Sequence, residues 1–87
     1  MKPTIQEIKH NVQNFIVESF LKNSDTKDLS ESTPLISGGI MDSISTMQLV
    51  NFLENKYNFE FQAHEVDRDN LDTIAIIANF VLSKIGG

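Results

Sequence analysis

Apolar residues recur every three or four positions near the start of the chain, over about residues 4–21. Polar side chains fill the positions between them, which is the pattern of an amphipathic helix with one buried face. Thr4 and Glu7 form a capping box at the start of this stretch, and Pro3 precedes them. A first helix is therefore predicted there. Its buried face is expected to comprise Ile5, Ile8, Val12, Phe15, Ile16 and Phe20.

The same spacing returns over residues 43–57, where a second helix is predicted. This helix is expected to end near Asn58, because asparagine tolerates the left-handed conformation of a helix C-cap. Phe52 lies beside the apolar stripe and either widens it or faces a partner. The stripe predicted to point inward consists of Ile44, Met47, Val50, Leu53 (or Leu49) and Tyr57.

A last main helix is predicted over residues 73–84, after the helix-start pattern Asn70-Leu71-Asp72-Thr73. Lys84 near its end suits the helix dipole. One short helix is placed at about residues 64–68, in a stretch with little periodicity. The inward face of the last helix is expected to comprise Ile74, Ile77, Ala78, Val81 and Ile85.

No helical or strand period is found between the first two helices. A connection of about 20 residues is long for a compact domain and indicates an ordered or functional loop. Leu29, Leu35 and Ile36 are expected to pin it to the core. Since no helix can bury its apolar face alone, we predict an all-α fold, a small four-helix bundle that forms a single domain over residues 1–87.

The composition argues against several classes of function. The 87-residue chain has no cysteine, which excludes disulfides, thiolate metal sites and a cysteine nucleophile. Its two histidines, His10 and His64, are far apart in sequence, so no metal site is expected. The net charge of -5 disfavours nucleic-acid backbones and anionic membrane surfaces, and it favours partners with basic patches. No nucleic-acid partner is expected.

The sequence also gives no indication of a signal peptide or a membrane-spanning segment. The start of the chain lacks the apolar core of a signal peptide, and no apolar run approaches the roughly 18 residues of a membrane span. We therefore expect a cytoplasmic monomer without membrane insertion.

Candidate chemistry gathers where the second helix begins, in the run Gly38-Gly39-Ile40-Met41-Asp42-Ser43. Serine and aspartate are favoured helix caps, so one interpretation of Ser43 is an ordinary cap. The other is an attachment site, because the partial positive charge of a helix N-terminus favours a phosphodiester there. No histidine, lysine or second base lies nearby in sequence to activate the hydroxyl, so no catalytic residue is predicted.

The segment Leu35-Ile36-Ser37-Gly38-Gly39-Ile40-Met41-Asp42-Ser43-Ile44 resembles the phosphopantetheine attachment region of acyl and peptidyl carrier proteins. The hallmark of that family is Asp-Ser-Leu or Asp-Ser-Ile at the start of the second helix. The resemblance covers nearly the whole chain. It extends to Thr46, Leu49-Val50, Leu53-Glu54, Tyr57, Phe61, Val66 and Leu71-Asp72-Thr73-Ile74.

The resemblance implies a carrier rather than an enzyme. A phosphopantetheinyl transferase would attach the 4'-phosphopantetheine of coenzyme A to Ser43, and Asp42 would help to position the transferase's metal-bound coenzyme A. The terminal thiol of this arm would hold an acyl or aminoacyl group as a thioester. Further implied partners are a loading ligase or adenylating enzyme and a downstream transferase or synthase of a lipid, fatty acid or secondary-metabolite pathway. The partner surface is expected to comprise Ile44, Met47, Gln48, Phe52 and Val66.

The charge of the second helix departs from the family pattern. Fatty acid synthase carriers typically have acids along its exposed face, whereas Glu54 is the only acid between Ser43 and Tyr57 here. Since charge complementarity governs partner choice, a specialised stand-alone carrier is expected, resembling D-alanyl, aminoacyl or secondary-metabolite carriers. Ser45 lies where fatty-acid-type carriers often have an acid, but Asp42 directly precedes only Ser43, which remains the expected acceptor.

Three phenylalanines bear on the size of the cargo. Carriers of long chains open a pocket between the second and last helices, and Phe59, Phe61 and Phe80 could fill that space with ring atoms. Filling it would favour short or amino-acid cargo. The same residues more often belong to an ordinary core, since phenylalanine is among the commonly buried types.

Two functions of other classes stay open at this point. A helical interaction module without a prosthetic group would use the surface of Ile44, Met47 and Phe52. The terminal Gly86-Gly87 is typical of ubiquitin-like modifiers and sulfur carriers. That fold needs an early β-hairpin, and the first twenty residues carry a helical stripe instead.

Overall fold

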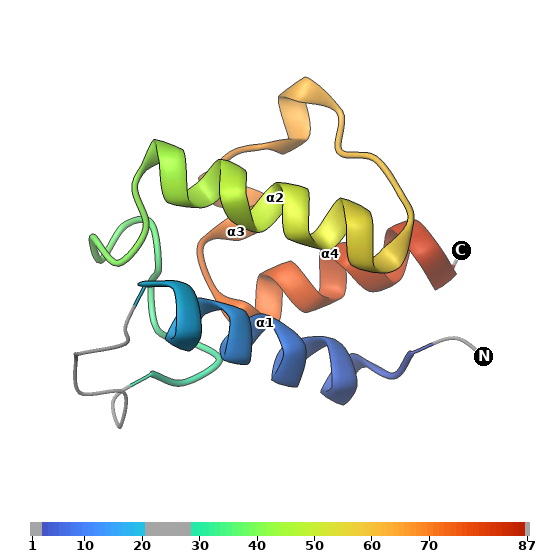
Figure 1. Ribbon diagram of the computed structural model, residues 1–87, viewed down its shortest axis with the longest axis horizontal. Helices are drawn as coiled ribbons and strands as arrows, with labels where there is room; N and C mark the ends of the chain where they lie inside the picture. Colours follow the sequence, from blue (N-terminus) through green and yellow to red (C-terminus); the bar gives the residue numbers. More distant parts are fainter. Residues whose placement is uncertain (1–2, 21–28, 87) are drawn as a thin grey trace.

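The computed structural model describes residues 3–20 and 29–86, and every regular element within these ranges is helical (Figure 1). The prediction of a small all-α bundle is therefore confirmed. In chain order the elements are α1 (Ile5–Phe20), α2 (Ser43–Tyr57), the 3₁₀ helix η1 (Ala63–Glu65), α3 (Arg68–Leu71) and α4 (Ile74–Gly86).

The three main helices lie where the apolar periodicity predicts them. The α1 helix begins at the predicted cap, where the backbone amide of Glu7 donates to Thr4 Oγ1 (3.2 Å). The residue predicted to end this helix, Leu21, lies outside the described residues. The α2 helix has its predicted bounds, and its cap Asn58 adopts the expected left-handed conformation with a φ of 58°.

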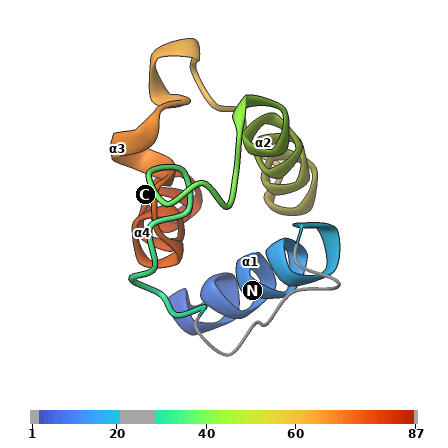
Figure 2. The ribbon, with the colours of Figure 1, turned by 90° about the vertical axis from the view of Figure 1, so that its left-hand side faces the viewer.

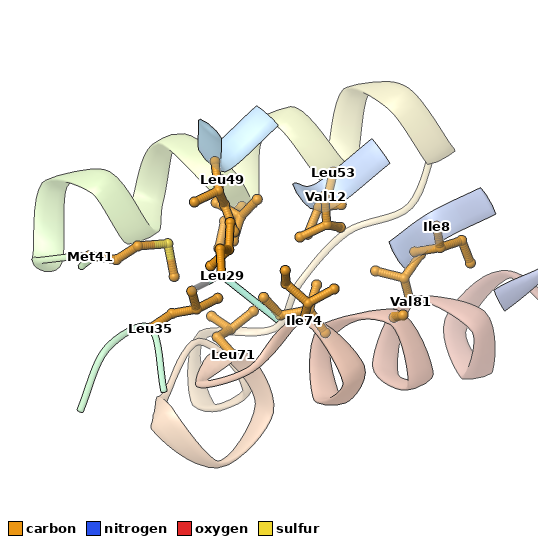
Figure 3. Close-up of a cluster of buried hydrophobic side chains, with 14 residues drawn as sticks. Ile8, Val12, Leu29, Leu35, Met41, Leu49, Leu53, Leu71, Ile74 and Val81 are labelled. Carbon is orange, nitrogen blue, oxygen red and sulfur yellow. The ribbon is translucent and has the colours of Figure 1, made fainter. Parts of the chain in front are cut away.

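The hydrophobic core lies between α1, α2 and α4, which surround it on three sides (Figure 2). Each of these helices contributes aliphatic side chains that meet in the centre of the molecule (Figure 3). Burying one such side chain contributes about 1.5–3 kcal/mol. The buried core consists of Ile8, Val12, Ile16, Leu29, Leu35, Met41, Leu49, Val50, Leu53, Leu71, Ile74, Ile77, Ala78 and Val81.

Residues 29–42 form an ordered connection that passes the beginning of α4 and leads into α2 (Figure 2). Leu29 and Leu35 are buried, as predicted. The buried side chain of Met41 is a third anchor, which the sequence pattern does not identify because it lies outside any periodic stretch. The backbone amide of Ala75 also donates to the carbonyl oxygen of Glu31 (3.0 Å). The segment before α2 is thus attached to α4.

The single short helix predicted at residues 64–68 is wrong in its bounds. The turn of η1 ends at Glu65, and a separate turn, α3, begins at Arg68. Asp67 separates the two because its backbone is extended and its Oδ1 accepts the amide of Asn70 (3.2 Å) as an N-cap.

The inward stripe predicted for α2 is partly wrong. Ile44 and Met47 are 71% and 47% exposed, whereas Thr46 and Leu49 are buried. Thr46 can be buried because its hydroxyl donates to the carbonyl oxygen of Asp42 (2.7 Å), which leaves no polar atom without a partner. The helix therefore faces the core with Thr46, Leu49, Val50 and Leu53.

The ubiquitin-like alternative is wrong. Such a fold needs a β-hairpin early in the chain, and α1 occupies residues 5–20 instead. The terminal Gly86-Gly87 pair, whose second residue lies outside the described part, carries no argument for that function.

Candidate functional site

Asp42, and not Ser43, caps α2. The backbone of Asp42 is extended, and its Oδ1 accepts the amide of Ser45 (2.8 Å), while its carbonyl oxygen accepts the amide of Thr46 (2.9 Å). Ser43 is the first residue of the helix and is exposed. Within the described residues its hydroxyl makes no hydrogen bond. The capping role that one interpretation gave to Ser43 therefore belongs to its neighbour.

The carboxylate of Asp42 is held in its charged form. The amide and the hydroxyl of Ser45 donate to it and lower its pKa from the usual 3.8. Ser45 itself is half-buried, and its amide is engaged in the cap. The acid beside Ser43 is consequently ionised at neutral pH, and the neighbouring serine is more enclosed than Ser43.

Two glycines shape the turn that precedes Asp42. A side chain at Gly38 would run into the carbonyl oxygen of Pro34, and Gly39 has a φ of +83°, which side-chain-bearing residues rarely adopt. The turn is closed by the amide of Met41, which donates to the carbonyl oxygen of Leu35 (2.9 Å). The chain is thereby folded tightly just before the helix that carries Ser43.

A carboxylate from a distant part of the chain holds this turn. Asp72, between α3 and α4, accepts the amides of Ile36 and Ser37 on its Oδ1, both at 2.9 Å. Its Oδ2 accepts the hydroxyl of Ser37, also at 2.9 Å. The donors from Ser37 and Ile36 lower the pKa of Asp72, and the positive charge of Arg68 adds to the effect. In the sequence, Asp72 stands out as part of a helix-start pattern, and no local signal indicates these contacts.

A cavity of about 500 Å³ lies beside Ser43. Ile36, Met47 and Val66 give it an apolar wall. Arg68 brings a positive charge to the same cavity, and no carboxylate of the described residues forms an ion pair with it. The remaining lining residues are Asp42, Ser43, Thr46 and Asp67. The cavity therefore offers an apolar wall together with one cationic and two acidic side chains beside Ser43.

The residues predicted as a partner surface fall into two groups. Ile44, Met47 and Gln48 are exposed on the N-terminal half of α2, close to Ser43 in the helix. Val66 is half-buried and lines the cavity beside Ser43. The ring of Phe52 is also half-buried, and it stacks on a ring of α1 at a centroid distance of 4.3 Å. It does not join the exposed group.

The three phenylalanines considered for their effect on cargo size, Phe59, Phe61 and Phe80, pack on one another. Phe61 stacks on Phe80 of α4 at a centroid distance of 5.1 Å, and Phe59 lies 5.1 Å from Phe61. The rings thus join the connection after α2 to the middle of α4.

Neither a metal site nor a membrane-spanning helix occurs in the described residues. In residues 3–20 and 29–86 no three histidine or acidic side chains come together in a way that could hold a metal ion. None of the helices described there has the length and apolar character needed to cross a membrane.

Similarity to known proteins points to carriers. The chain is 27% identical over 79 residues to the D-alanyl carrier proteins of two strains of Streptococcus suis, 98HAH33 and 05ZYH33. The alignments cover 91% of this chain and 91% of each relative. No family model matches the chain. The likeness is low in identity but spans almost the full length of both proteins, and it supports a carrier protein.

Proposed function

We propose that this protein carries an acyl or aminoacyl group on a 4'-phosphopantetheine arm attached to Ser43. The observation that carries the proposal is the exposed hydroxyl of Ser43, which caps nothing although it stands in the first turn of a helix. Asp42 performs the cap, so the hydroxyl is available to another enzyme. The full-length similarity to D-alanyl carrier proteins supports the same function.

The surroundings of Ser43 fit the arm. A phosphodiester at the first residue of α2 would meet the positive end of the helix dipole, and the positive charge of Arg68 would partly offset the carboxylates of Asp42 and Asp67 in the cavity lining. The apolar wall formed by Ile36, Met47 and Val66 suits the methyl and methylene groups of the arm. The terminal thiol of the bound arm would hold the cargo as a thioester.

The chain's own part in attachment is small. The Ser43 oxygen forms the new bond to phosphorus and loses its proton, and adenosine 3',5'-bisphosphate leaves coenzyme A. No described side chain is hydrogen-bonded to the hydroxyl and could take that proton. The transferase would therefore supply the base, and the protein would be a substrate rather than an enzyme.

The proposed cargo is short, and an aminoacyl group is favoured. Carriers of long chains would need a pocket between α2 and α4, and the stacking of Phe61, after α2, on Phe80 of α4 disfavours such an opening. The named relatives are carriers of D-alanine, which is an amino acid. A ligase that activates such an acid and a transferase that removes it would be the partners, meeting Ile44, Met47 and Gln48 on α2.

Intact mass spectrometry tests the proposal. The protein is incubated with coenzyme A and a broad-specificity phosphopantetheinyl transferase, and one phosphopantetheine group should be added to the wild type. Ser43→Ala should gain nothing, because it removes the acceptor oxygen. The matched control Ser45→Ala should be modified like the wild type. If the wild type gained no mass, or Ser43→Ala still gained it, the proposal would be wrong.

An interaction module is the second candidate, and the exposure of Ile44 and Met47 favours it. It differs from the carrier in one measurable respect, since it predicts a partner that binds the unmodified protein. A partner that binds wild type and Ser43→Ala with equal affinity would favour the interaction module. Binding that requires the modified protein would favour the carrier.

A further inference from the structure

We propose that Asp72 is a positioning residue for the modification of Ser43. On this view Asp72 fixes residues 35–42 in the conformation that a phosphopantetheinyl transferase recognises. The inference rests on the proposed function, because it concerns how the acceptor serine is presented. It assigns a role to a carboxylate that lies 29 positions after Ser43, between two other helices.

The contacts of Asp72 are concentrated on three consecutive residues. Its backbone carbonyl oxygen accepts the amide of Leu35. Its carboxylate accepts the amides of Ile36 and Ser37 and the hydroxyl of Ser37, each at 2.9 Å. Hydrogen bonds to an ionised acceptor are about twice as strong as those between neutral groups. One residue thus holds the beginning of the turn by four hydrogen bonds.

The turn transmits this restraint to the start of α2. The amide of Gly39 donates to the carbonyl oxygen of Ile36 (3.2 Å), and that of Met41 donates to Leu35 (2.9 Å). Leu35 and Met41 are both buried, so each end of the turn is also packed in the core. Met41 is followed directly by Asp42, the cap of α2. A chain of direct contacts therefore connects Asp72 to the residue before Ser43.

Without the carboxylate, the backbone amides of Ile36 and Ser37 would lose their acceptor, and the turn would keep only the contacts of Leu35, Gly39 and Met41. Gly38 and Gly39 are exposed, and glycine has the widest conformational freedom of any residue. The main helices are also held by aliphatic side chains of α1, α2 and α4 that pack in the core and do not contact the carboxylate through hydrogen bonds. Losing it should loosen the presentation of Ser43 more than it loosens the fold.

The kinetics of modification test the inference. Asp72→Ala should lower kcat/KM for phosphopantetheine transfer about tenfold, mostly through a higher KM for the carrier, because only part of the population would present the competent turn. Asp72→Asn keeps an oxygen that can accept the two amides, so it should recover part of the loss. Ser37→Ala removes one hydrogen bond and should cost about threefold.

A matched control separates positioning from loss of charge or stability. Glu31→Gln removes one negative charge from the same connection and breaks the exposed ion pair with Lys9, but it leaves the contacts of Asp72 intact. Its kcat/KM should equal that of the wild type. Amide hydrogen exchange adds a structural readout: Asp72→Ala should accelerate exchange at Ile36, Ser37 and Met41, and exchange in the middle of α4 should stay unchanged.

The outcomes distinguish this inference from the proposed function. One outcome is that the wild type is modified and that Asp72→Ala and Ser37→Ala both show the kcat/KM of the wild type. The inference would then be wrong, and the carrier function would stand. A second outcome is that the modification rate of Asp72→Ala falls only in proportion to the fraction of that variant that is unfolded. A structural role would then account for the result, and positioning would be rejected. If the wild type is not modified at all, the proposed function fails, and the inference fails with it.

Discussion

The two ends of α2 are built differently. At the C-terminal end, Phe52 stacks on Phe15 at 4.3 Å, and the Tyr57 hydroxyl accepts a hydrogen bond from Asn11 Nδ2 (2.9 Å). At the N-terminal end, Ile44 is largely exposed, and the chain before the helix is held by polar contacts to Asp72. One end joins the helix to α1, and the other leaves the Ser43 side chain and the apolar side chains of Ile44 and Met47 exposed.

The comparison shows how a small domain can combine stability with access. Side-chain packing at the C-terminal end orders α2 without using the surface near Ser43. Hydrogen bonds and glycine geometry at the N-terminal end fix the backbone while leaving the Ser43 side chain exposed. Mutations at the two ends should therefore differ in effect: those at the C-terminal end should lower stability alone, and those at the N-terminal end should slow modification.

Leu53→Ala should have the largest effect on stability. Leu53 is fully buried, and truncating a buried leucine lowers the free energy of unfolding by about 2–5 kcal/mol. Ile44→Ala on the exposed face of the same helix is the control, and it should change stability by less than about 0.5 kcal/mol. Urea unfolding measures both. Equal losses in the two variants would contradict the distinction between the buried and exposed faces.

Gly39→Val should affect both stability and modification. Valine disfavours the positive φ of +83°, at an expected cost of about 1–2 kcal/mol, and the turn would relax away from its present shape. Asparagine tolerates that conformation better, so Gly39→Asn is the control. Transfer kinetics and urea unfolding should both rank valine below asparagine. A valine variant that is modified as fast as the wild type would show that the turn geometry is unimportant.

The sequence predicts the helices well and their contacts less well. The apolar spacing in α1 and α4 is regular, and the buried residues Ile8, Val12, Ile77 and Val81 are those predicted. In α2 the pattern is ambiguous, because apolar residues occur on several faces and the buried Thr46 looks polar in the sequence. Thr46 can be buried because its hydroxyl donates a hydrogen bond to the carbonyl oxygen of Asp42, which the sequence pattern does not reveal.

At the candidate site, too, local features can be predicted from the sequence and long-range contacts cannot. The run of glycines, Asp42 and Ser43 is local in sequence and could be recognised without a structure. The contacts of Asp72 with Ser37 join residues 35 positions apart, and no local pattern specifies such a pairing. The split between η1 and α3 was also missed, because segments of three and four residues carry too little periodicity to predict.

Tyr57→Phe should have a moderate effect. It removes the hydroxyl that Asn11 Nδ2 contacts and keeps the ring, so the loss should be about 0.5–1.5 kcal/mol. The rate of modification of Ser43 should not change, since the contact lies at the other end of α2. Thermal unfolding and transfer kinetics on the same samples check both parts. A slower modification would contradict the proposed separation of the two ends.

The dependence of stability on pH should be the smallest effect. The folded pKa of Asp72 is below its usual 3.8, chiefly because Ser37 donates to it, and Arg68 on α3 is the charged group that lowers it further. Its contribution to stability is therefore complete above about pH 4 and is lost as pH falls through the folded pKa. The stability difference between wild type and Asp72→Asn should shrink on acidification. A difference that stays constant down to about pH 2 would contradict this assignment.

The most direct test of the account is to locate the modification within the chain. The protein would be treated with transferase and coenzyme A, digested, and fragmented by tandem mass spectrometry. We expect phosphopantetheine on the Ser43 oxygen alone, at the first residue of α2. Phosphopantetheine on Ser37 or Ser45, or no modified peptide from a folded wild-type sample, would contradict it.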